Sequence, residues 1–142
     1  MIRDALARFQ RDTRGVAAIE FAFVIVPLLL FMFGIIEFSR AYWTQEALQE
    51  TATVTARCMG LGLSSCSSPS AGQAYAVSVG SRWGLSIQSS NVTINPSTTC
   101  GSVSGFVTVT ITYPFNTIVP GLITGLVGET LSATACFPSG SF

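Results

Sequence analysis

The chain of 142 residues contains no histidine and no lysine, and charged residues make up only 10% of it. Without histidine there is no Ser-His-Asp or Cys-His arrangement for nucleophilic catalysis. Without lysine there is no phosphate-binding loop of the kind in which a lysine follows the glycines. The net charge of zero gives no general attraction to nucleic acid. We therefore expect a protein that is not an enzyme, uses no cofactor and binds no nucleic acid.

The few charges are unevenly distributed. Four arginines and two aspartates precede residue 15, whereas residues 21–36 carry no charge. Residues 16–36 would measure about 30 Å as an α-helix, which is the thickness of a hydrocarbon core. Arginines before an apolar run hold that end of the chain in the cytoplasm. The pattern predicts a cytoplasmic leader at 1–15, a helix across a lipid bilayer at 16–37, and all later residues on the outer side.

Glu20 lies at the start of this apolar run. Three interpretations of the run give Glu20 no role: a signal peptide, a buried core helix and a plain membrane anchor. A secretory signal peptide would require a small-x-small cleavage site after the run, and "EFSRAYWTQEAL" at 37–48 offers none. A buried core helix would require a larger partner domain than the remaining residues provide. A plain membrane anchor explains the length and the orientation. It leaves Glu20 as a carboxylate that reaches the cytoplasmic rim.

The helix is expected to continue beyond the membrane to residue 58. Residues 16–58 contain one proline, Pro27, which removes a backbone donor and should kink the helix. Tyr42 and Trp43 fall where an interfacial aromatic belt would lie. In the extramembrane continuation, 38–58, apolar residues recur at helical spacing: Phe38, Ala41, Tyr42, Leu48, Ala52 and Ala56. Glu46 and Glu50 lie one turn apart and are expected on a solvated face.

Residues 59–142 predict an extracytoplasmic α+β domain. A glycine- and serine-rich loop at 59–72 ends the long helix. A second helix of about twelve residues follows, for which Ser70 is the expected N-terminal cap and Gly84 the expected end. The fold class is therefore α+β, with a long N-terminal helix, a short helix and a small antiparallel sheet.

The sheet is predicted from the last third of the chain. "NVTIN" (91–95) is a short strand that Pro96 is expected to end. In "FVTVTITYPF" (106–115) and "TLSATACF" (130–137), apolar residues alternate with polar ones, as in a half-buried antiparallel strand. The core-facing residues would be Val107, Val109, Ile111, Tyr113, Leu131, Ala133, Ala135 and Phe137. The apolar segment at 114–129 is expected to be a loop folded over the sheet or a contact surface for another subunit.

The four cysteines, Cys58, Cys66, Cys100 and Cys136, all lie on the predicted outer side. Their irregular spacing and the absence of histidine argue against a zinc site, so we expect no metal. Disulfides in an oxidising compartment fit better, and four cysteines allow three pairings. Cys58–Cys66 would join the end of the long helix to its following loop. Cys100–Cys136 would join the approach to one strand to the end of another.

The stretch "RGVAAIEFAFVIVPLLLFMFGIIEFSRAYW" (14–43) resembles the N-terminus of the TadE-like family. Members of that family are pseudopilins of the tight adherence (Flp/Tad) type IV pilus system. The segments "VTVTITYPF" and "VPGLITGLVGETLSATACF" are also similar to the outer β portion of the family. In this group a prepilin peptidase cuts after a glycine, and a glutamate is the fifth mature residue. The resemblance assigns the cut to the bond between Gly15 and Val16, and the glutamate to Glu20.

The resemblance implies a pilin-like minor subunit of an adhesive pilus. Its partners would be the prepilin peptidase, other pilin or pseudopilin subunits and the assembly platform of the bacterial inner membrane. It would cross that membrane once, with its N-terminus cytoplasmic and its C-terminal domain periplasmic, and would reach the extracellular pilus on assembly. Glu20 would offset the new α-amine of a neighbouring subunit, because an isolated charge inside a membrane is costly. The alternative is an unprocessed single-pass accessory protein whose periplasmic domain binds a partner.

Overall fold

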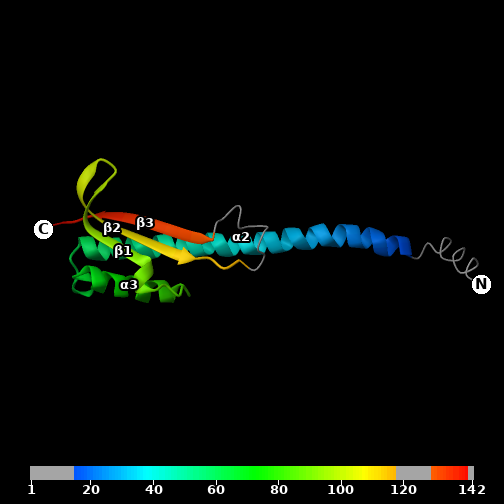
Figure 1. Cartoon of the computed structure of the whole chain (residues 1–142), viewed down its shortest axis with the longest axis horizontal. Coiled ribbons are helices and arrows are strands. Elements are labelled where there is room, and N and C mark those ends of the chain that lie inside the picture. The colour runs from blue at the N-terminus through cyan, green and yellow to red at the C-terminus, as the bar shows by residue number, and fades with distance from the viewer. Residues whose placement is uncertain (1–14, 118–128, 141–142) are drawn as a thin grey trace, which may run out of the picture. The chain divides into compact units, whose positions relative to one another are not determined.

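The computed structural model describes residues 15–117 and 129–140. Within them lie two α-helices and one antiparallel sheet of three strands, which confirms the predicted α+β class (Figure 1). The leader at 1–14 and residues 118–128 of the apolar segment lie outside the described residues. The elements are α2 (Val16–Gly60), α3 (Pro69–Arg82), β1 (Val92–Cys100), β2 (Val103–Pro114) and β3 (Thr130–Pro138).

The chain divides into two compact units, Met1–Ile36 and Glu37–Phe142, and α2 contributes to both. The helix continues through Pro27, so this residue does not end it. A kink at Pro27 stays a prediction. The second unit contains the C-terminal part of α2, the helix α3 and the three-stranded sheet.

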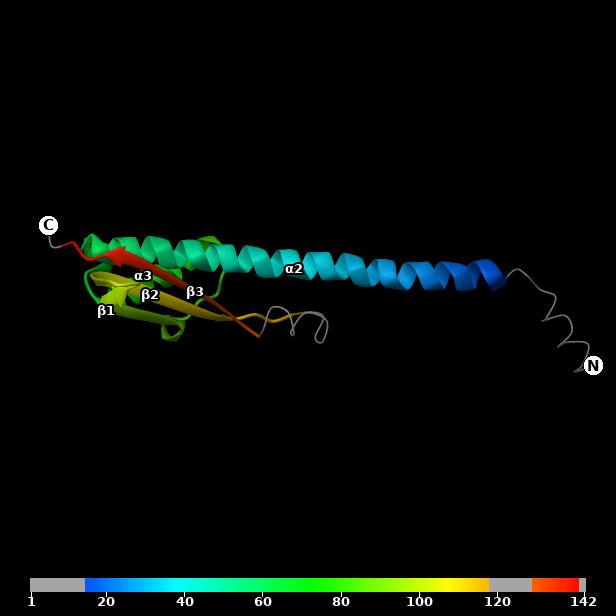
Figure 2. The same ribbon diagram turned by 90° about the horizontal axis from the view of Figure 1, so that it is seen from above.

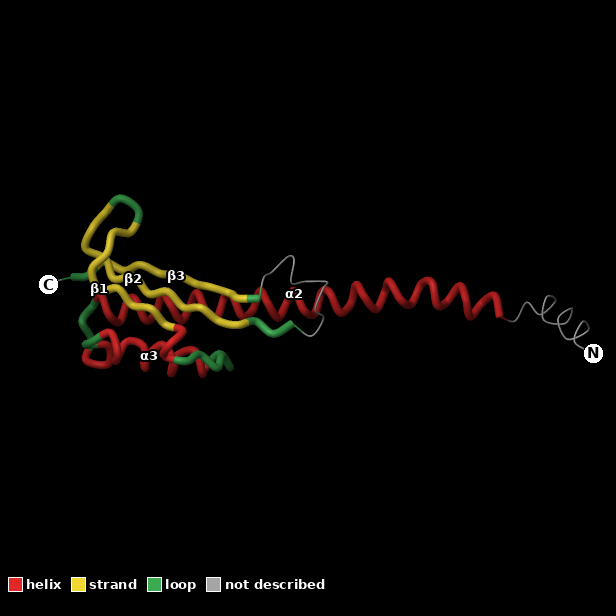
Figure 3. The backbone as a smooth tube through the Cα atoms, viewed as in Figure 1, coloured by secondary structure: helices red, strands yellow, loops and turns green. Residues whose placement is uncertain are grey.

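The sheet has the order β1-β2-β3, with both neighbouring pairs antiparallel (Figure 3). The predicted alternation is confirmed: one face is buried, with Tyr113 and Phe137 only partly covered, and the other face carries threonines. The central strand β2 pairs Val109 with Ile94 on one side and with Ala135 on the other. This register places the apolar residues of all three strands on the same face.

The core of the second unit lies between this face and the C-terminal half of α2, which runs along the sheet in both views (Figures 1 and 2). Leu48 and Ala52 are fully buried there, together with Ala41, Ala47 and Ala56. Alanine at four of these five positions lets the helix backbone approach the sheet closely. Phe38 and Tyr42, predicted on the same face, are instead about 60% exposed.

The prediction that Pro96 ends the first strand was wrong, because β1 continues to Cys100. The pairing with β2 shifts register between Asn95 and Thr98, so the proline occupies a bulge. A proline is tolerated there because β1 is an edge strand and the bulge relieves the need for its missing N–H.

The other edge of the sheet is covered by α2. Gln45 and Gln49 donate side-chain hydrogen bonds to the backbone carbonyls of Ser132 and Thr134, at 2.9 and 3.3 Å. These carbonyls belong to β3, so its outer edge is partly satisfied within the chain.

The cap of α3 also differs from the prediction. Ser68, not Ser70, is the N-cap, and its hydroxyl accepts a hydrogen bond from the backbone N–H of Ala71. Pro69 follows as the first helical residue, a position at which proline is favoured. Gly84 follows the C-cap with a φ of +76°, as predicted for the end of this helix.

Candidate functional site

The predicted processing junction lies at the start of α2. Gly15 immediately precedes Val16, the first residue of the helix. Among the described residues, a Cβ atom added at Gly15 would meet no atom within 4 Å, and the φ angle of Gly15 is outside the left-handed region. Neither packing nor backbone geometry therefore requires glycine at this position.

Glu20 lies one helical turn after Val16 and is exposed. The four-residue spacing puts Val16 and Glu20 on the same face of α2. Among the described residues no ion pair involves Glu20.

Residues 21–36 of α2 form an apolar helical stretch with no buried residue. By length and composition, α2 is the one helix among the described residues that could cross a membrane, and its most apolar stretch is unburied. The exposed apolar side chains point in all directions around the helix axis, because they occupy consecutive positions: Leu28, Leu29, Leu30, Phe31, Met32 and Phe33.

At the start of the second unit, α2 carries a buried carboxylate that was not predicted from the sequence. Glu37 is 2% exposed and accepts a hydrogen bond of 2.7 Å from Nη1 of Arg40. The Arg40 guanidinium also lies over the ring of Phe115, 5.8 Å from its centroid. The i, i+3 spacing of Glu37 and Arg40 is a visible signal for the pair. The burial of Glu37 is not visible in the sequence.

All four cysteines form disulfides, as predicted, and the structure gives the pairing that the sequence left open. Cys58–Cys66, with a Cα–Cα distance of 5.9 Å, joins the last turn of α2 to the following turn. Cys100–Cys136, at 6.4 Å, joins the end of β1 to β3 across the central strand. These bonds confirm the expected disulfides. Among the described residues no group of three His, Cys, Asp or Glu side chains is placed to hold a metal ion.

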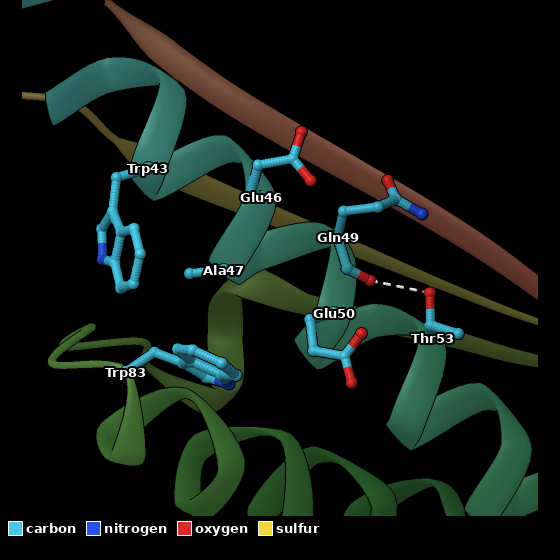
Figure 4. A pocket seen from close by; sticks show the side chains of 7 residues that line it. All are labelled: Trp43, Glu46, Ala47, Gln49, Glu50, Thr53 and Trp83. Carbon is cyan, nitrogen blue, oxygen red and sulfur yellow. Dashed lines mark hydrogen bonds between the residues drawn. The ribbon is translucent and has the colours of Figure 1, made fainter. Parts of the chain in front are cut away.

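A groove of about 370 Å³ lies between α2 and the C-terminal end of α3, inside the second unit. Figure 4 shows the Trp43 side chain pointing toward Trp83, with Glu46 and Glu50 on successive turns of α2. The two indole rings are 6.0 Å apart in an edge-to-face arrangement. Glu46 and Glu50 are exposed, as predicted, but they line this groove. The groove was not predicted from the sequence, because Trp43 and Trp83 lie far apart in the chain.

One comparison with known proteins found a match. The model of the family described as TadE-like protein matches residues 15–57 of this chain. The match confirms, over that segment, the family resemblance seen in the sequence. It begins at Gly15 and includes Val16, Glu20 and Pro27. Searches of curated proteins and of solved structures returned no match.

Proposed function

We propose that this chain is a minor pilin or pseudopilin that takes part in assembling an adhesive Tad (Flp) type IV pilus. A prepilin peptidase would cut between Gly15 and Val16, and the mature chain would enter a filament or prime its growth. The observation that carries the proposal is the combination at the start of the matched segment. There an unconstrained glycine precedes the uncovered apolar stretch of α2 at 16–36, and that stretch contains one carboxylate, Glu20.

The chemistry of the cut accounts for that carboxylate. Cleavage would release residues 1–15 and leave a free α-amine on Val16, at the end of an apolar helix. A charge in hydrocarbon costs several kcal/mol unless it is paired. Glu20 of one subunit would accept the amine of its neighbour as subunits stack, and this pairing would fix their axial register.

The proposal also covers location and partners. The basic leader would stay in the cytoplasm, residues 16–37 would cross the bacterial inner membrane once, and the disulfide-bonded domain would lie in the periplasm. The chain would meet the prepilin peptidase, the assembly platform and other pilin subunits, and it would catalyse no reaction and bind no cofactor.

Co-expression of the full chain with the matching prepilin peptidase tests the proposal. We expect an intact mass that lacks residues 1–15 and an N-terminus at Val16. Expression without the peptidase is the control and should retain the leader. A chain that keeps residues 1–15 beside an active peptidase, with a known prepilin cut in the same cells, would show that it is an unprocessed accessory protein.

A further inference from the structure

In the second unit, one face of α2 is exposed, and α3 touches it only at its C-terminal end, where Trp83 packs on Trp43. The exposed residues on this face recur at intervals of three and four: Trp43, Glu46, Glu50, Thr53 and Arg57. That spacing forms a stripe nearly parallel to the helix axis, of the kind by which two helices pack side by side. The stripe is negative in its first half and ends with a positive charge.

The first half of the stripe has the chemistry of a site for a guanidinium group. The groove there is lined by two tryptophans, Trp43 and Trp83, and by two glutamates, Glu46 and Glu50. Aromatic faces attract cations, and a guanidinium both stacks on rings and binds carboxylates through paired hydrogen bonds. Two carboxylates at i, i+4 repel each other slightly, so a bound cation would also relieve that repulsion.

The groove has no cation of its own among the described residues, since the described salt bridge joins Arg40 to Glu37 instead. The chain has no lysine, and four of its seven arginines precede residue 15. Arg57 and Arg82 are therefore the remaining arginines of the second unit, and both are exposed. Of these, Arg57 lies on the stripe itself.

Arg57 is too far along α2 to pair with the carboxylates of its own groove, although Thr53 at the near end of the groove is only one turn away. Seven residues separate it from Glu50, which is about 10 Å along the axis, whereas helical ion pairs form over three or four residues. A second copy moved along the axis by about 10 to 17 Å would bring its Arg57 level with Glu46 and Glu50 of the first.

We propose that the groove of one copy binds the Arg57 side chain of a second copy, with the two α2 helices parallel and axially shifted. The parallel orientation rests on the proposed function, in which all subunits enter the filament the same way. Each copy then gives Arg57 to one neighbour and receives Arg57 from another. Such a contact is heterologous and can repeat without closing. It would be a second contact between subunits, outside the apolar helix and independent of Glu20.

Charge reversal in the full chain tests this pairing. Two differently tagged copies are co-expressed, and their association in detergent is measured with and without the peptidase. Arg57→Glu alone and Glu50→Arg alone should each weaken self-association about tenfold, which corresponds to about 1.4 kcal/mol. A mixture of the two variants should restore it, because the two reversed side chains then face each other across the contact with opposite charges.

Arg82→Glu is the matched control, since it reverses an exposed arginine that lies off the stripe, and it should leave association unchanged. Arg57→Gln separates the contact from any effect of Arg57 on the end of α2. It should weaken association less than Arg57→Glu does, with the same unfolding midpoint as the parent.

Three outcomes would overturn the pairing: no effect of Arg57→Glu, no restoration in the mixture, or an equal loss with Arg82→Glu. A Glu46→Gln, Glu50→Gln variant gives a further test. If it self-associates normally but forms no pili, the groove binds a different basic subunit, and the pairing with Arg57 is overturned as well. The N-terminus is read from the same samples. A retained leader with the charge effects intact would refute the processing proposal alone, whereas a Val16 N-terminus without them would refute only the pairing.

Discussion

One helix, α2, passes through two different environments. Between residues 16 and 36 it has no buried residue, although nearly all of its large side chains are apolar. Between residues 37 and 60 it buries one face against the sheet, through residues such as Leu48, Ala52 and Ala56. In the second half, packing within the chain explains the choice of residues. In the first half it does not.

The apolar residues at 16–36 must therefore be explained by a contact with something outside the chain. A continuous apolar surface of this size is unfavourable in water and is typical of a membrane or protein contact. Packing among the described residues likewise gives no role to Gly15 or Glu20. Under the proposed function, Gly15 acts in processing and Glu20 in assembly, so variants of the two halves should fail in different ways.

The largest effect is expected from Glu20→Ala. Removing one partner of a desolvated charge pair costs about 3 to 5 kcal/mol, so pilus assembly should fall by at least a factor of about 100. Cleavage at Val16 and membrane insertion should be unaffected. Counting surface pili on cells that carry the variant measures the effect.

Glu20→Asp is the matched control, because it keeps the charge and should retain part of the assembly. Normal piliation by Glu20→Ala would count against charge pairing between subunits.

The double variant Cys100→Ser, Cys136→Ser is expected to lower the stability of the second unit and to leave cleavage at Val16 unchanged. This disulfide closes a loop with a sequence separation of 36, so in the loop-entropy description its loss should lower the free energy of unfolding by about 4 kcal/mol. Both tryptophans, Trp43 and Trp83, lie in the second unit, and their fluorescence during denaturation of the full chain measures its stability.

The second disulfide gives an internal comparison. Cys58 and Cys66 have a sequence separation of 8, so replacing both with serine should lower the free energy of unfolding by less, about 2.5 kcal/mol. A larger loss here than in the other pair would contradict the entropic explanation.

A smaller loss is expected from Arg40→Ala. This change removes the charge-assisted hydrogen bond to buried Glu37 and the contact with Phe115, so the free energy of unfolding should fall by about 1 to 3 kcal/mol. The same tryptophan fluorescence measures it. Arg82→Ala, at an exposed position, is the control and should change stability by less than about 0.5 kcal/mol. Equal effects of the two variants would show that the Glu37–Arg40 pair adds nothing.

Much of the second unit was predictable because its signals are local. The two-residue alternation around Val109 and Ala133 identified two strands and their buried face. The cap of α3 was also within reach, since Pro69 favours the first helical position and so points to Ser68 rather than Ser70.

Other features depend on contacts between distant segments. Pro96 lies within a strand because β1 is an edge and bulges there, which no local pattern reveals. The choice among three cysteine pairings required the register of β1, β2 and β3. The groove required α3 to bring Trp83 beside Trp43.

The most direct test measures both halves of α2 in one experiment. Gly15→Val and the Cys100→Ser, Cys136→Ser variant are each co-expressed with the peptidase, beside the parent chain, and analysed for intact mass and unfolding. We predict that Gly15→Val keeps residues 1–15 with unchanged stability, whereas the cysteine variant is cut at Val16 like the parent but is less stable. A parent chain that keeps its leader, or a Gly15→Val chain that is still cut at Val16, would contradict the assignment of Gly15 to processing.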